Sequence, residues 1–364
     1  MARILYGVMG DARGHVARAL NVAAELPHHE FLFVGGGAVR DVRNLGYPVE
    51  EIPMASTLYR NNRVDFPATV ARAAKVFAGS RPVVSRVADI IRGYDPDLIV
   101  SDYEYFTPLA ARKQGRPCVS LDHQHVITHC SYRPPADQRI SRFLTSLAIS
   151  RLYSSASLFL IVSFYAVPPA NPLTTCVLPP IIGRDVTELR ASQGDHVLVY
   201  QTSPTFHRLL PVLETMESRF IIYGHGKKPE RKNLIFKAPS RSGFLADLAS
   251  CRYAITNGGH NVLSEALYLH KPLLTFPIAN AYEQFLNAYF VRCLGYGDYS
   301  LAAVPPVQVL RDFESRLDRF RGVVRTGEFF GNRQVAEAVE SLIGKGFGGT
   351  VSAGGASDRP CAMA

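Results

Sequence analysis

A glycine-rich turn in the last third of the sequence has the residue types that bind a nucleotide diphosphate. The apolar stretch Tyr253 to Thr256 leads into Gly258-Gly259, and an expected helix carrying Ser264 and Glu265 follows. A strand-to-helix turn of this kind leaves backbone N–H groups at the positive end of the helix, which favours a pyrophosphate. The carboxylate further along the helix can accept hydrogen bonds from a ribose diol.

A second polar motif follows the next apolar stretch. Leu273 to Phe276 is expected to form a buried strand, and the helix after it carries Glu283, Gln284 and Asn287. Carboxylate and amide groups at such a position can hydrogen-bond the hydroxyls of a sugar. The glycine pair alone is weak support for a nucleotide site, because most turns of that kind only connect elements. The two motifs in succession are far more specific.

The whole run from Tyr253 to Ala288 resembles the nucleotide-sugar-binding signature of GT-B glycosyltransferases, especially the MurG-like and UDP-glucuronosyltransferase-like families. The resemblance implies an α/β protein of the GT-B fold, with two Rossmann-like domains that face one another across a cleft. It implies a UDP-sugar as donor substrate. The diphosphate would lie on the glycine pair, the ribose on Glu265 and the transferred sugar on Glu283 and Gln284. Glu283 stands where the family often has aspartate, which leaves the sugar open.

The resemblance also assigns flanking residues to the nucleotide sugar. Phe244 would pack on the base, although an ordinary core residue is the alternative, and Asn287 would hold the glycine turn. The segment Gln201 to Thr205 lies where related proteins have a glycine-rich loop, but it lacks the glycines. The further residues implied to lie near the donor are Gly14, Thr202, Ser203, Gly224, Leu245, Asn257, His260, Asn261 and Ser264.

The first apolar stretch of the chain runs into Gly14-His15, just before an expected helix from Ala17 to Leu26. The motif is not G-x-G-x-x-G, and no acidic residue follows in the dinucleotide pattern, so NAD binding is discounted. A helix N-terminus disfavours positive charge, so a histidine there stays neutral and can take a proton from an acceptor hydroxyl. The resemblance also places Gly-His at this point. The alternative is a capping or structural histidine.

An aspartate is expected to orient this base. Asp102 follows the expected strand Leu98 to Ser101, and related UDP-dependent glycosyltransferases have an aspartate near this point. The resemblance therefore makes His15 and Asp102 the catalytic pair, with the aspartate in the role of a triad carboxylate. Glu104 competes for that role, and Asp102 would instead cap the following helix in the alternative interpretation.

The run Asp122-His123-Gln124-His125 looks like a metal motif at the end of a third expected strand. A zinc site needs third and fourth ligands, and no second cluster offers them. We therefore expect His123 and His125, together with Glu104, to contact the acceptor. No metal and no cofactor other than the donor substrate is expected.

Length and composition agree with an ordinary globular enzyme. The chain has 364 residues, 47% hydrophobic and 20% charged, which suits two domains. The N-terminus reads as a strand and not as a signal peptide, and the cysteines lack C-x-x-C spacing, so a cytoplasmic protein with reduced thiols is expected. The net charge of +9 favours anionic partners. No nucleic-acid module is visible, so nucleic acid is not expected as a partner.

Apolar stretches alternate with helical patterns in both halves, as in βαβ units. We expect an acceptor domain over residues 1–166 and a donor domain over 167–345, which begins with the proline-rich stretch Val167 to Pro180. The resemblance implies that the closing helix, Arg333 to Ile343, packs back on the first domain. Residues 346–364 are rich in Gly, Ser and Ala and are expected to be disordered.

Two basic stretches bear on the acceptor. Thr57 to Gly93 has seven basic residues against two acidic ones, with apolar residues at near-helical spacing, and Arg133 to Arg151 is also basic. Such a surface can rest on anionic lipid, so a peripheral enzyme at the inner face of the plasma membrane is one interpretation. A solvated helical face is the other.

The sequence thus predicts an inverting glycosyltransferase. It would move a hexose or N-acetylhexosamine from a UDP-sugar to an acceptor hydroxyl, on a glycolipid or another cell-envelope glycoconjugate. Two alternatives stay open. One is an enzyme like the non-hydrolysing UDP-GlcNAc 2-epimerase, and the other is a non-catalytic subunit of a two-component glycosyltransferase.

Overall fold

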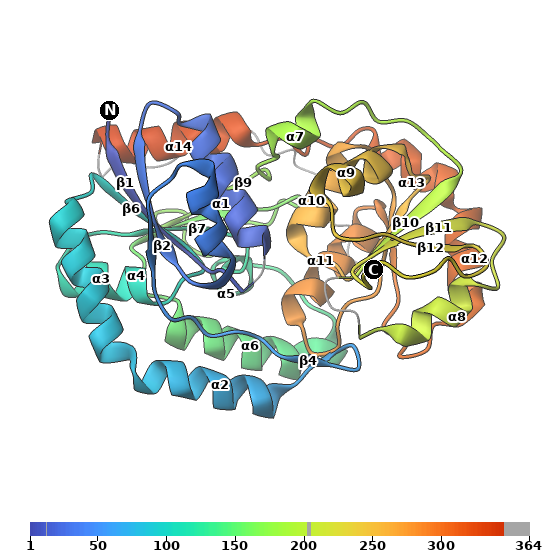
Figure 1. The fold of residues 1–364 in the computed structure, drawn as a ribbon, viewed down its shortest axis with the longest axis horizontal. Helices are drawn as coiled ribbons and strands as arrows, with labels where there is room; N and C mark the ends of the chain where they lie inside the picture. The colour runs from blue at the N-terminus through green and yellow to red at the C-terminus, as the bar shows by residue number, and fades with distance from the viewer. Residues whose placement is uncertain (12, 202–204, 346–364) are drawn as a thin grey trace. The chain divides into compact units, whose positions relative to one another are not determined.

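The structure is a computed structural model that describes residues 1–364 except 12, 202–204 and 346–364 (Figure 1). The predicted tail therefore lies outside the described residues. The chain divides into two compact units. Of the described residues, the first unit holds 1–58, 66–181 and 330–345, and the second holds 59–65 and 182–329.

A parallel sheet forms the centre of the first unit, with the strand order β3-β2-β1-β6-β7-β8-β9. Its strands are nearly continuous buried apolar runs, as expected when helices cover both faces of a parallel sheet. The order reverses between β1 and β6, which makes the carboxyl ends of these two strands the switch point where open α/β sheets bind ligands. The strands are β1 (Arg3–Val8), β2 (Glu30–Gly35), β3 (Val49–Glu51), β6 (Leu98–Asp102), β7 (Val119–Asp122), β8 (Leu158–Val162) and β9 (Thr175–Leu178).

Helices cover this sheet on its two faces. One core joins alternate residues of β1 to α1 (Arg13–Glu25), η1 (Gly37–Leu45) and α14 (Asn332–Lys345). The other core joins the opposite face to α3 (Ser80–Tyr94) and α4 (Phe106–Lys113). The remaining helices of the unit are α2 (Phe66–Ala78), α5 (Val126–His129), η2 (Ala136–Gln138) and α6 (Arg139–Leu152).

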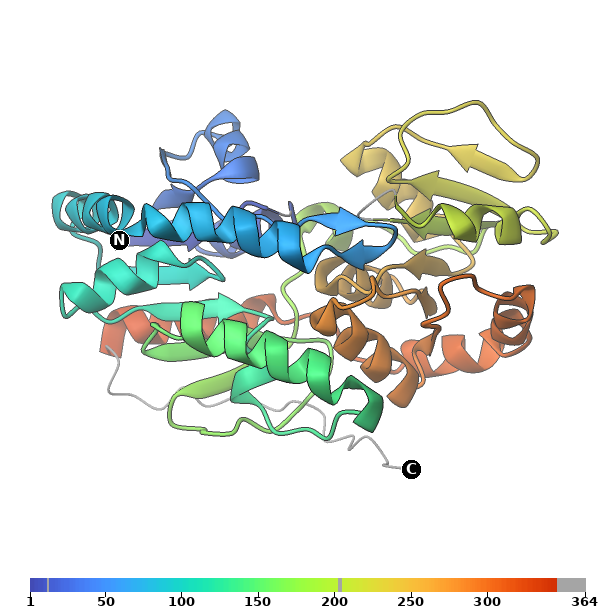
Figure 2. The same cartoon turned by 90° about the horizontal axis from the view of Figure 1, so that it is seen from below.

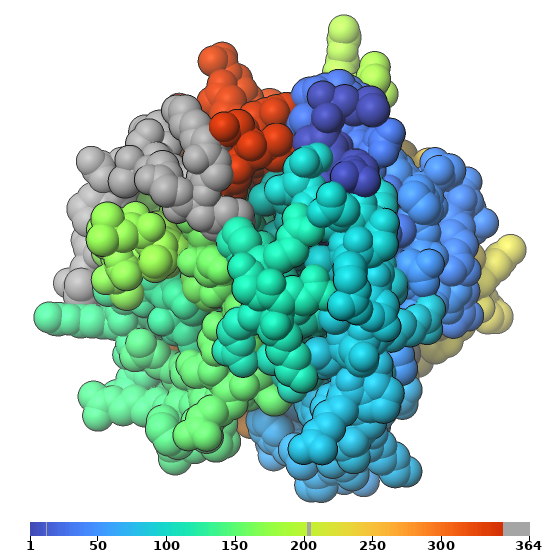
Figure 3. All heavy atoms as spheres, turned by 90° about the vertical axis from the view of Figure 1, so that its left-hand side faces the viewer, coloured from blue at the N-terminus to red at the C-terminus, as the bar shows by residue number. Residues whose placement is uncertain are grey.

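The last described helix, α14, belongs to the first unit. Val335, Ala338, Val339 and Leu342 are buried in the core that also contains α1, and their spacing gives one apolar face of a helix. In the space-filling view of Figure 3 this helix lies beside the N-terminal residues. The chain therefore returns to the first unit after completing the second.

The unit boundary differs from the prediction at 166/167. Thr175 to Leu178 forms β9, which pairs in parallel with β8 and is the edge strand of the first sheet. The division lies between Ile181 and Ile182. The prediction was wrong because the prolines on both sides of this four-residue strand made the whole stretch look like a linker.

The second unit repeats the same topology, with the parallel order β12-β11-β10-β13-β14-β15 and a switch point between β10 and β13. Its strands are β10 (His196–Tyr200), β11 (Arg219–Tyr223), β12 (Leu234–Phe236), β13 (Ala254–Thr256), β14 (Leu273–Thr275) and β15 (Gly297–Tyr299). Its helices are α7 (Arg184–Thr187), η3 (His207–Leu209), α8 (Leu210–Leu213), α9 (Arg241–Ser250), α10 (His260–Tyr268), α11 (Tyr282–Cys293), α12 (Val307–Ser315) and α13 (Leu317–Val324).

A small hairpin from the N-terminal half completes the second unit. Strands β4 (Tyr59–Arg60) and β5 (Arg63–Val64) are joined by two asparagines with φ of 52° and 55°, the conformation of a type I′ turn. The amide of Val64 donates to the carbonyl of Ala279 at 3.0 Å, in the loop after β14. Thr57 to Gly93 is therefore not one amphipathic segment but a hairpin followed by α2 and α3.

No helix among the described residues is long and apolar enough to cross a membrane.

Candidate active site

The switch point of the first sheet brings two predicted residues together. Strands β1 and β6 pair in parallel with Val8 opposite Asp102, the last residue of β6. Helix α1 begins at Arg13, shortly after β1 ends, so His15 lies in its first turn. The carboxyl ends of two neighbouring strands thus place a carboxylate beside a helix N-terminus.

His15 and Asp102 form a close hydrogen bond, with 2.6 Å between Nδ1 and Oδ1. The aspartate side chain is fully buried, whereas 12% of the histidine side chain is exposed. At this distance the hydrogen belongs on Nδ1 and is donated to the carboxylate, which leaves the lone pair of Nε2 able to accept a proton. The geometry is that of a base oriented by a carboxylate.

Arg18 is a third member of this group that the sequence analysis missed. Its Nε donates to Asp102 Oδ2 at 2.7 Å and its Nη2 donates to Oδ1 at 2.5 Å, so the guanidinium forms a bidentate ion pair with the carboxylate. The side chain is only 3% exposed. Burial lowers and the charge of Asp102 raises the pKa of Arg18, and the net result is above its ordinary value. The sequence did contain a signal for this role of Arg18: it lies three residues after His15, on a helix face that is otherwise apolar.

Tyr103 covers the histidine. Its ring stacks on that of His15 with centroids 6.0 Å apart and on that of Tyr153 at 4.1 Å. The backbone of Tyr103 has φ of 52°, which is costly for an aromatic residue and is held by the surrounding structure. This turn follows Asp102 directly, so the aspartate and the stacked ring are set by one local conformation.

Glu104 has a structural role in this structure. Its two carboxylate oxygens accept hydrogen bonds from the amides of Phe106 and Thr107, at 2.7 and 2.6 Å, which caps the N-terminus of α4. The residue is 5% exposed. Helix capping, considered as the alternative role of Asp102, is thus performed by Glu104. The prediction that Glu104 contacts the acceptor has no support in these contacts.

The two histidines after β7 are buried and bonded within the protein. His123 Nδ1 lies 2.8 Å from the carbonyl of Val162, and His125 Nδ1 lies 2.6 Å from Asp122 Oδ2. They are 0% and 1% exposed. Burial raises the pKa of Asp122, but the charge of His125 and the hydrogen bonds from His125 and Ser120 lower it, and the net pKa lies well below its usual range. The contact of these two histidines with the acceptor stays a prediction, and the structure shows both rings bonded to groups of the protein itself.

The switch point of the second sheet carries the glycine turn. Gly258 has φ of 91°, and a Cβ there would lie 2.7 Å from the carbonyl oxygen of Gln284. Its amide donates to Thr256 Oγ1 at 3.1 Å, and its carbonyl accepts from Asn287 Nδ2 at 3.0 Å. Asn287 thus holds the turn, and the turn leads directly into the N-terminus of α10.

At the ends of the neighbouring strands lie buried polar atoms that have no hydrogen-bond partner among the described residues. Asn257 Nδ2 donates to Gln201 Oε1 at 3.1 Å, but Gln201 Nε2 is buried and has no hydrogen bond among the described residues. Both ring nitrogens of His225 are also buried, and they make no hydrogen bond to any described residue. Burial lowers the pKa of His225 to about 4. Thr202 and Ser203, which were predicted to contact the donor, lie outside the described residues.

The predicted ribose ligand, Glu265, is held by an arginine. Arg241 donates to its two oxygens from Nη1 at 3.1 Å and from Nη2 at 2.8 Å, and also to Asp185 from Nε at 2.8 Å. The glutamate side chain is 8% exposed and the arginine side chain 46% exposed. Burial raises and Arg241 lowers the pKa of Glu265, with a net increase. Each oxygen keeps a lone pair beyond the one that Arg241 uses.

Other residues predicted near the donor are in mixed surroundings. Phe244 is 7% exposed and packs on the rings of Tyr200 and Tyr223, as a core residue does. Ser264 donates its hydroxyl to the carbonyl of His260 at 2.9 Å. The remaining predicted residues lie around the turn or on nearby elements: Gly14 in α1, Gly224 after β11, buried Leu245 in α9, Asn261 in the first turn of α10, and Glu283 and Gln284 in the first turn of α11.

The comparisons with known proteins agree with this arrangement. The family model of glycosyl transferase family 1 matches residues 2–318. The chain belongs to glycosyl transferase family 1. Two relatives, from Methanosarcina acetivorans and Methanosarcina mazei and both described as uncharacterized glycosyltransferases, are each 23% identical over 94% of this chain and 99% of their own.

Solved structures similar to this glycosyltransferase share its fold. They include the glycotransferase of kitacinnamycin (TM-score 0.65, 16% identity, 93% of this chain and 98% of that chain). MurG of Acinetobacter baumannii has a TM-score of 0.60 and 15% sequence identity, and the match covers 94% of this chain and 100% of that chain. A UDP-glucosyltransferase from Polygonum tinctorium has a TM-score of 0.62 and 13% sequence identity, and the match covers 96% of this chain and 99% of that chain. The predicted GT-B fold and the family resemblance are confirmed.

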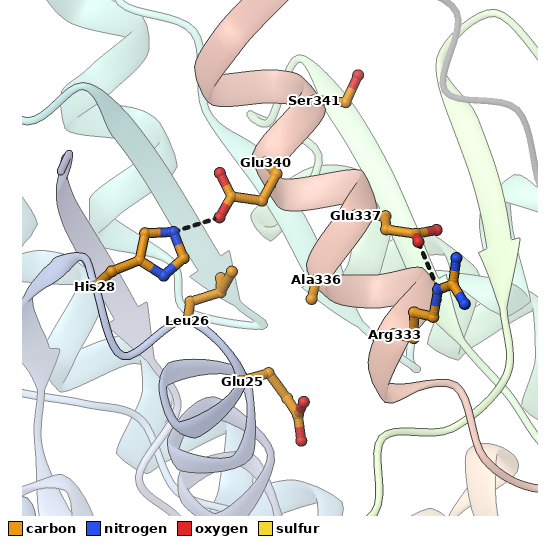
Figure 4. Close-up of a pocket in the computed structure, with 8 residues that line it drawn as sticks. All are labelled: Glu25, Leu26, His28, Arg333, Ala336, Glu337, Glu340 and Ser341. Atoms are coloured by element: carbon orange, nitrogen blue, oxygen red, sulfur yellow. Dashed lines mark hydrogen bonds and ion pairs between the residues drawn. The ribbon is translucent and has the colours of Figure 1, made fainter.

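One group of possible metal ligands stands out in the described part of the glycosyltransferase: His28, His29 and Glu340. It borders an open pocket of about 510 Å³ beside α14, in which Figure 4 shows His28 bonded to the glutamate. His29 Nδ1 accepts a hydrogen bond from the amide of Ala2 at 3.0 Å, so its hydrogen lies on Nε2, the atom that faces Glu340. That tautomer has no lone pair for a metal. The group anchors α14.

The glycine pair offers a matched test of the turn. Gly258→Ala should lower the free energy of unfolding by about 1–3 kcal/mol, because the new methyl group meets the Gln284 carbonyl and the left-handed conformation is strained. Gly259→Ala is the control: its φ is −67°, nothing lies within 4 Å of the added Cβ, and a change of about 0.5 kcal/mol or less is expected. Chemical denaturation measures both. Equal losses in the two variants would contradict this account of the turn.

Proposed function

We propose that this glycosyltransferase moves a hexose or N-acetylhexosamine from a UDP-sugar to an acceptor hydroxyl, with inversion at the anomeric carbon. The observation that carries the proposal is the His15–Asp102 hydrogen bond of 2.6 Å at the switch point of the first sheet. The glycine turn and the N-terminus of α10 stand at the corresponding point of the second sheet. A base and an anion-binding element are the two parts that such a transfer requires.

The reaction is a single displacement. His15 Nε2 takes the proton of the acceptor hydroxyl while that oxygen bonds to the anomeric carbon of the sugar. The bond from the same carbon to the diphosphate oxygen breaks, and UDP leaves with the electron pair. Asp102 stabilises the imidazolium that forms. The positive end of α10 stabilises the charge that develops on the diphosphate. Attack opposite to the leaving group inverts the configuration.

The donor site has groups for each part of a nucleotide sugar. The turn at Gly258 suits the diphosphate, and Gln201 and His225 offer buried polar atoms whose desolvation costs about 1–3 kcal/mol each when they stay unbonded. Glu265 keeps lone pairs that ribose hydroxyls can use beside Arg241. Glu283 and Gln284 in the first turn of α11 would contact the sugar. A bound donor would complete these hydrogen bonds.

A thermal-shift panel of nucleotides and nucleotide sugars tests the donor. We expect one UDP-sugar to raise the melting temperature more than UDP, and UDP to raise it more than 2′-deoxy-UDP, because the deoxy compound lacks a hydroxyl for Glu265. Gly259→Ala should keep the fold but reduce these shifts, since its methyl group occupies open space at the N-terminus of α10. The proposal fails if no nucleotide shifts the wild-type protein.

Substitution of the base tests the mechanism. His15→Gln should lower kcat by about 10²- to 10⁴-fold, since general-base catalysis contributes that much. The thermal shift with the donor should not change, because His15 acts on the acceptor. His28→Gln is the matched control, since that side chain is 60% exposed and lies beside α14. Full transferase activity in His15→Gln would sink the assignment. Turnover of UDP-GlcNAc without an acceptor would indicate an epimerase.

We infer that the acceptor is presented at an anionic membrane. Helices α2 and α6 lie on the same face of the first unit, the lower one in Figure 1, which faces the viewer in Figure 2. Neither helix contains an acidic residue. Exposed apolar side chains on them alternate with Arg72, Lys75, Arg139 and Arg151; they are Phe66, Val70, Ile140, Phe143, Leu144 and Leu147.

This combination suits a lipid surface. Each exposed cation contributes about 1 kcal/mol near an anionic bilayer, and the apolar side chains can enter the headgroup region. Ile140 and Phe143 are 78% and 65% exposed. An enzyme held in this way would reach a lipid-linked acceptor without a spanning helix.

Sedimentation with phosphatidylglycerol vesicles checks the membrane contact. The protein should pellet with the vesicles at low salt, pellet less at high salt and stay in solution with neutral vesicles. The double change Ile140→Ser and Phe143→Ser should weaken binding, whereas Leu301→Ser, a 49% exposed leucine of the second unit, should not. Absence of binding at low salt would remove the idea.

A further inference from the structure

We propose that Arg18 is a positioning residue that keeps His15 unprotonated by sharing Asp102. The inference rests on the proposed role of His15 as the base. Arg18 and His15 both approach the same carboxylate oxygen, Oδ1, and Arg18 alone holds Oδ2. The aspartate therefore has two cationic or potentially cationic partners. Arg18 is permanently charged, whereas His15 can gain or lose a proton.

The group is closed to solvent except at the histidine. Arg18 is 3% exposed and Asp102 is 0% exposed, so their charges are weakly screened. Other titratable groups around the pair come from neighbouring elements: Asp11 before α1, Tyr6 of β1, Asp122 of β7 and Tyr103 after β6. Tyr6 is fully buried, and its hydroxyl has no hydrogen-bond partner among the described residues. Arg18 is the cation that touches Asp102 at two atoms.

The charges then determine the state of the base. With Arg18 present, the negative charge of Asp102 is balanced before His15 takes any proton, so the histidine is free to be neutral. With the charge of Arg18 removed, Asp102 would be a buried carboxylate whose remaining partner is His15. A buried unpaired charge is costly, and the histidine would then keep a proton to relieve it. A protonated imidazole cannot accept the proton of an acceptor hydroxyl.

The bidentate contact of Arg18 with Asp102 also fixes the orientation of the His15 ring. Arg18 lies three residues after His15 on α1, so the two side chains leave the same face of one rigid helix. The guanidinium holds the plane of the carboxylate, and the carboxylate in turn holds Nδ1 of the histidine. Lysine at this position would keep the charge but lose the fork, which separates the electrostatic contribution from the geometric one.

The test follows the protonation of His15 directly by NMR of the imidazole Cε1–H signals, assigned by their loss in His15→Gln. In Arg18→Gln the titration midpoint of His15 should move to higher pH by roughly 1 to 3 units, the effect of an opposite charge at this range. In Arg18→Lys it should stay near that of the wild type. Circular dichroism and the melting temperature establish that each variant is folded.

A second variant keeps the test decisive if Arg18→Gln does not fold. The double change Arg18→Gln and Asp102→Asn leaves no unpaired buried charge, so its His15 midpoint should lie near that of the wild type, and below that of Arg18→Gln where the single variant folds. A midpoint that does not differ between wild type and folded Arg18→Gln, or one raised equally in the double variant, would overturn the proposal.

Activity gives an independent readout once an acceptor is known. The acid limb of the profile of kcat/KM against pH should move to higher pH in Arg18→Gln by the same interval as the NMR midpoint. On that limb kcat/KM should fall about tenfold for each pH unit of this displacement, and at high pH it should return to the wild-type value. Uniform loss at all pH values would indicate a purely structural arginine. The NMR experiment needs neither donor nor acceptor, so it stands even where the proposed transfer reaction fails.

Discussion

The buried carboxylate of Asp102 is the constraint on which the first unit depends. Placing a charge inside a protein is tolerated only with close partners, and removing one partner of such a pair typically costs about 3–5 kcal/mol. Asp102 is fully buried and bonded to both His15 and Arg18. These two side chains come from the first turns of α1, so the ion pair fixes how that helix follows β1. The same contacts that satisfy the charge therefore place the histidine.

The second unit solves a related problem with backbone geometry instead of charge. Its switch point between β10 and β13 carries Gly258, whose left-handed conformation and close approach to Gln284 admit no side chain. Thr256 and Asn287 hold the turn from two elements. Backbone geometry and neutral hydrogen bonds thereby fix the N-terminus of α10, and the positive end of a helix dipole favours an anion. One sheet topology thus positions the proposed base in one unit and the proposed anion-binding helix end in the other.

Sequence reasoning recovered the features that depend on local pattern. Long apolar runs gave most of the strands, and the motifs around His15 and Gly258 gave the family. What it missed depends on contacts distant in sequence. The pairing of Arg18 with Asp102 spans 84 residues, and the spacing of Arg18 from His15 on α1 does not by itself name the carboxylate that it binds.

The wrong or unsupported predictions have the same origin. The strand β9 is recognisable only by its pairing with β8, because prolines surround it. The hairpin at Tyr59 to Asp65 does carry a local signal, two adjacent asparagines that favour a type I′ turn, but its membership of the second unit is a tertiary fact. His123 and His125 looked accessible at a strand end, yet their rings turn into the protein because Val162 and Asp122 offer them acceptors.

Asp102 and Glu265 are each paired with an arginine, and the two pairs differ in exposure. Arg18 is 3% exposed and cannot leave Asp102 without opening the core. Arg241 is 46% exposed and is shared between Glu265 and Asp185. A carboxylate has about four lone-pair sites, of which the fork of Arg241 uses two. The proposed ribose contact therefore does not require the ion pair to break. Arg241 holds the plane of the Glu265 carboxylate, and the neutral hydroxyls of a ribose can bind its remaining lone pairs. The ion pair with Arg241 therefore already offsets the free-energy cost of burying the Glu265 charge in the protein without nucleotide.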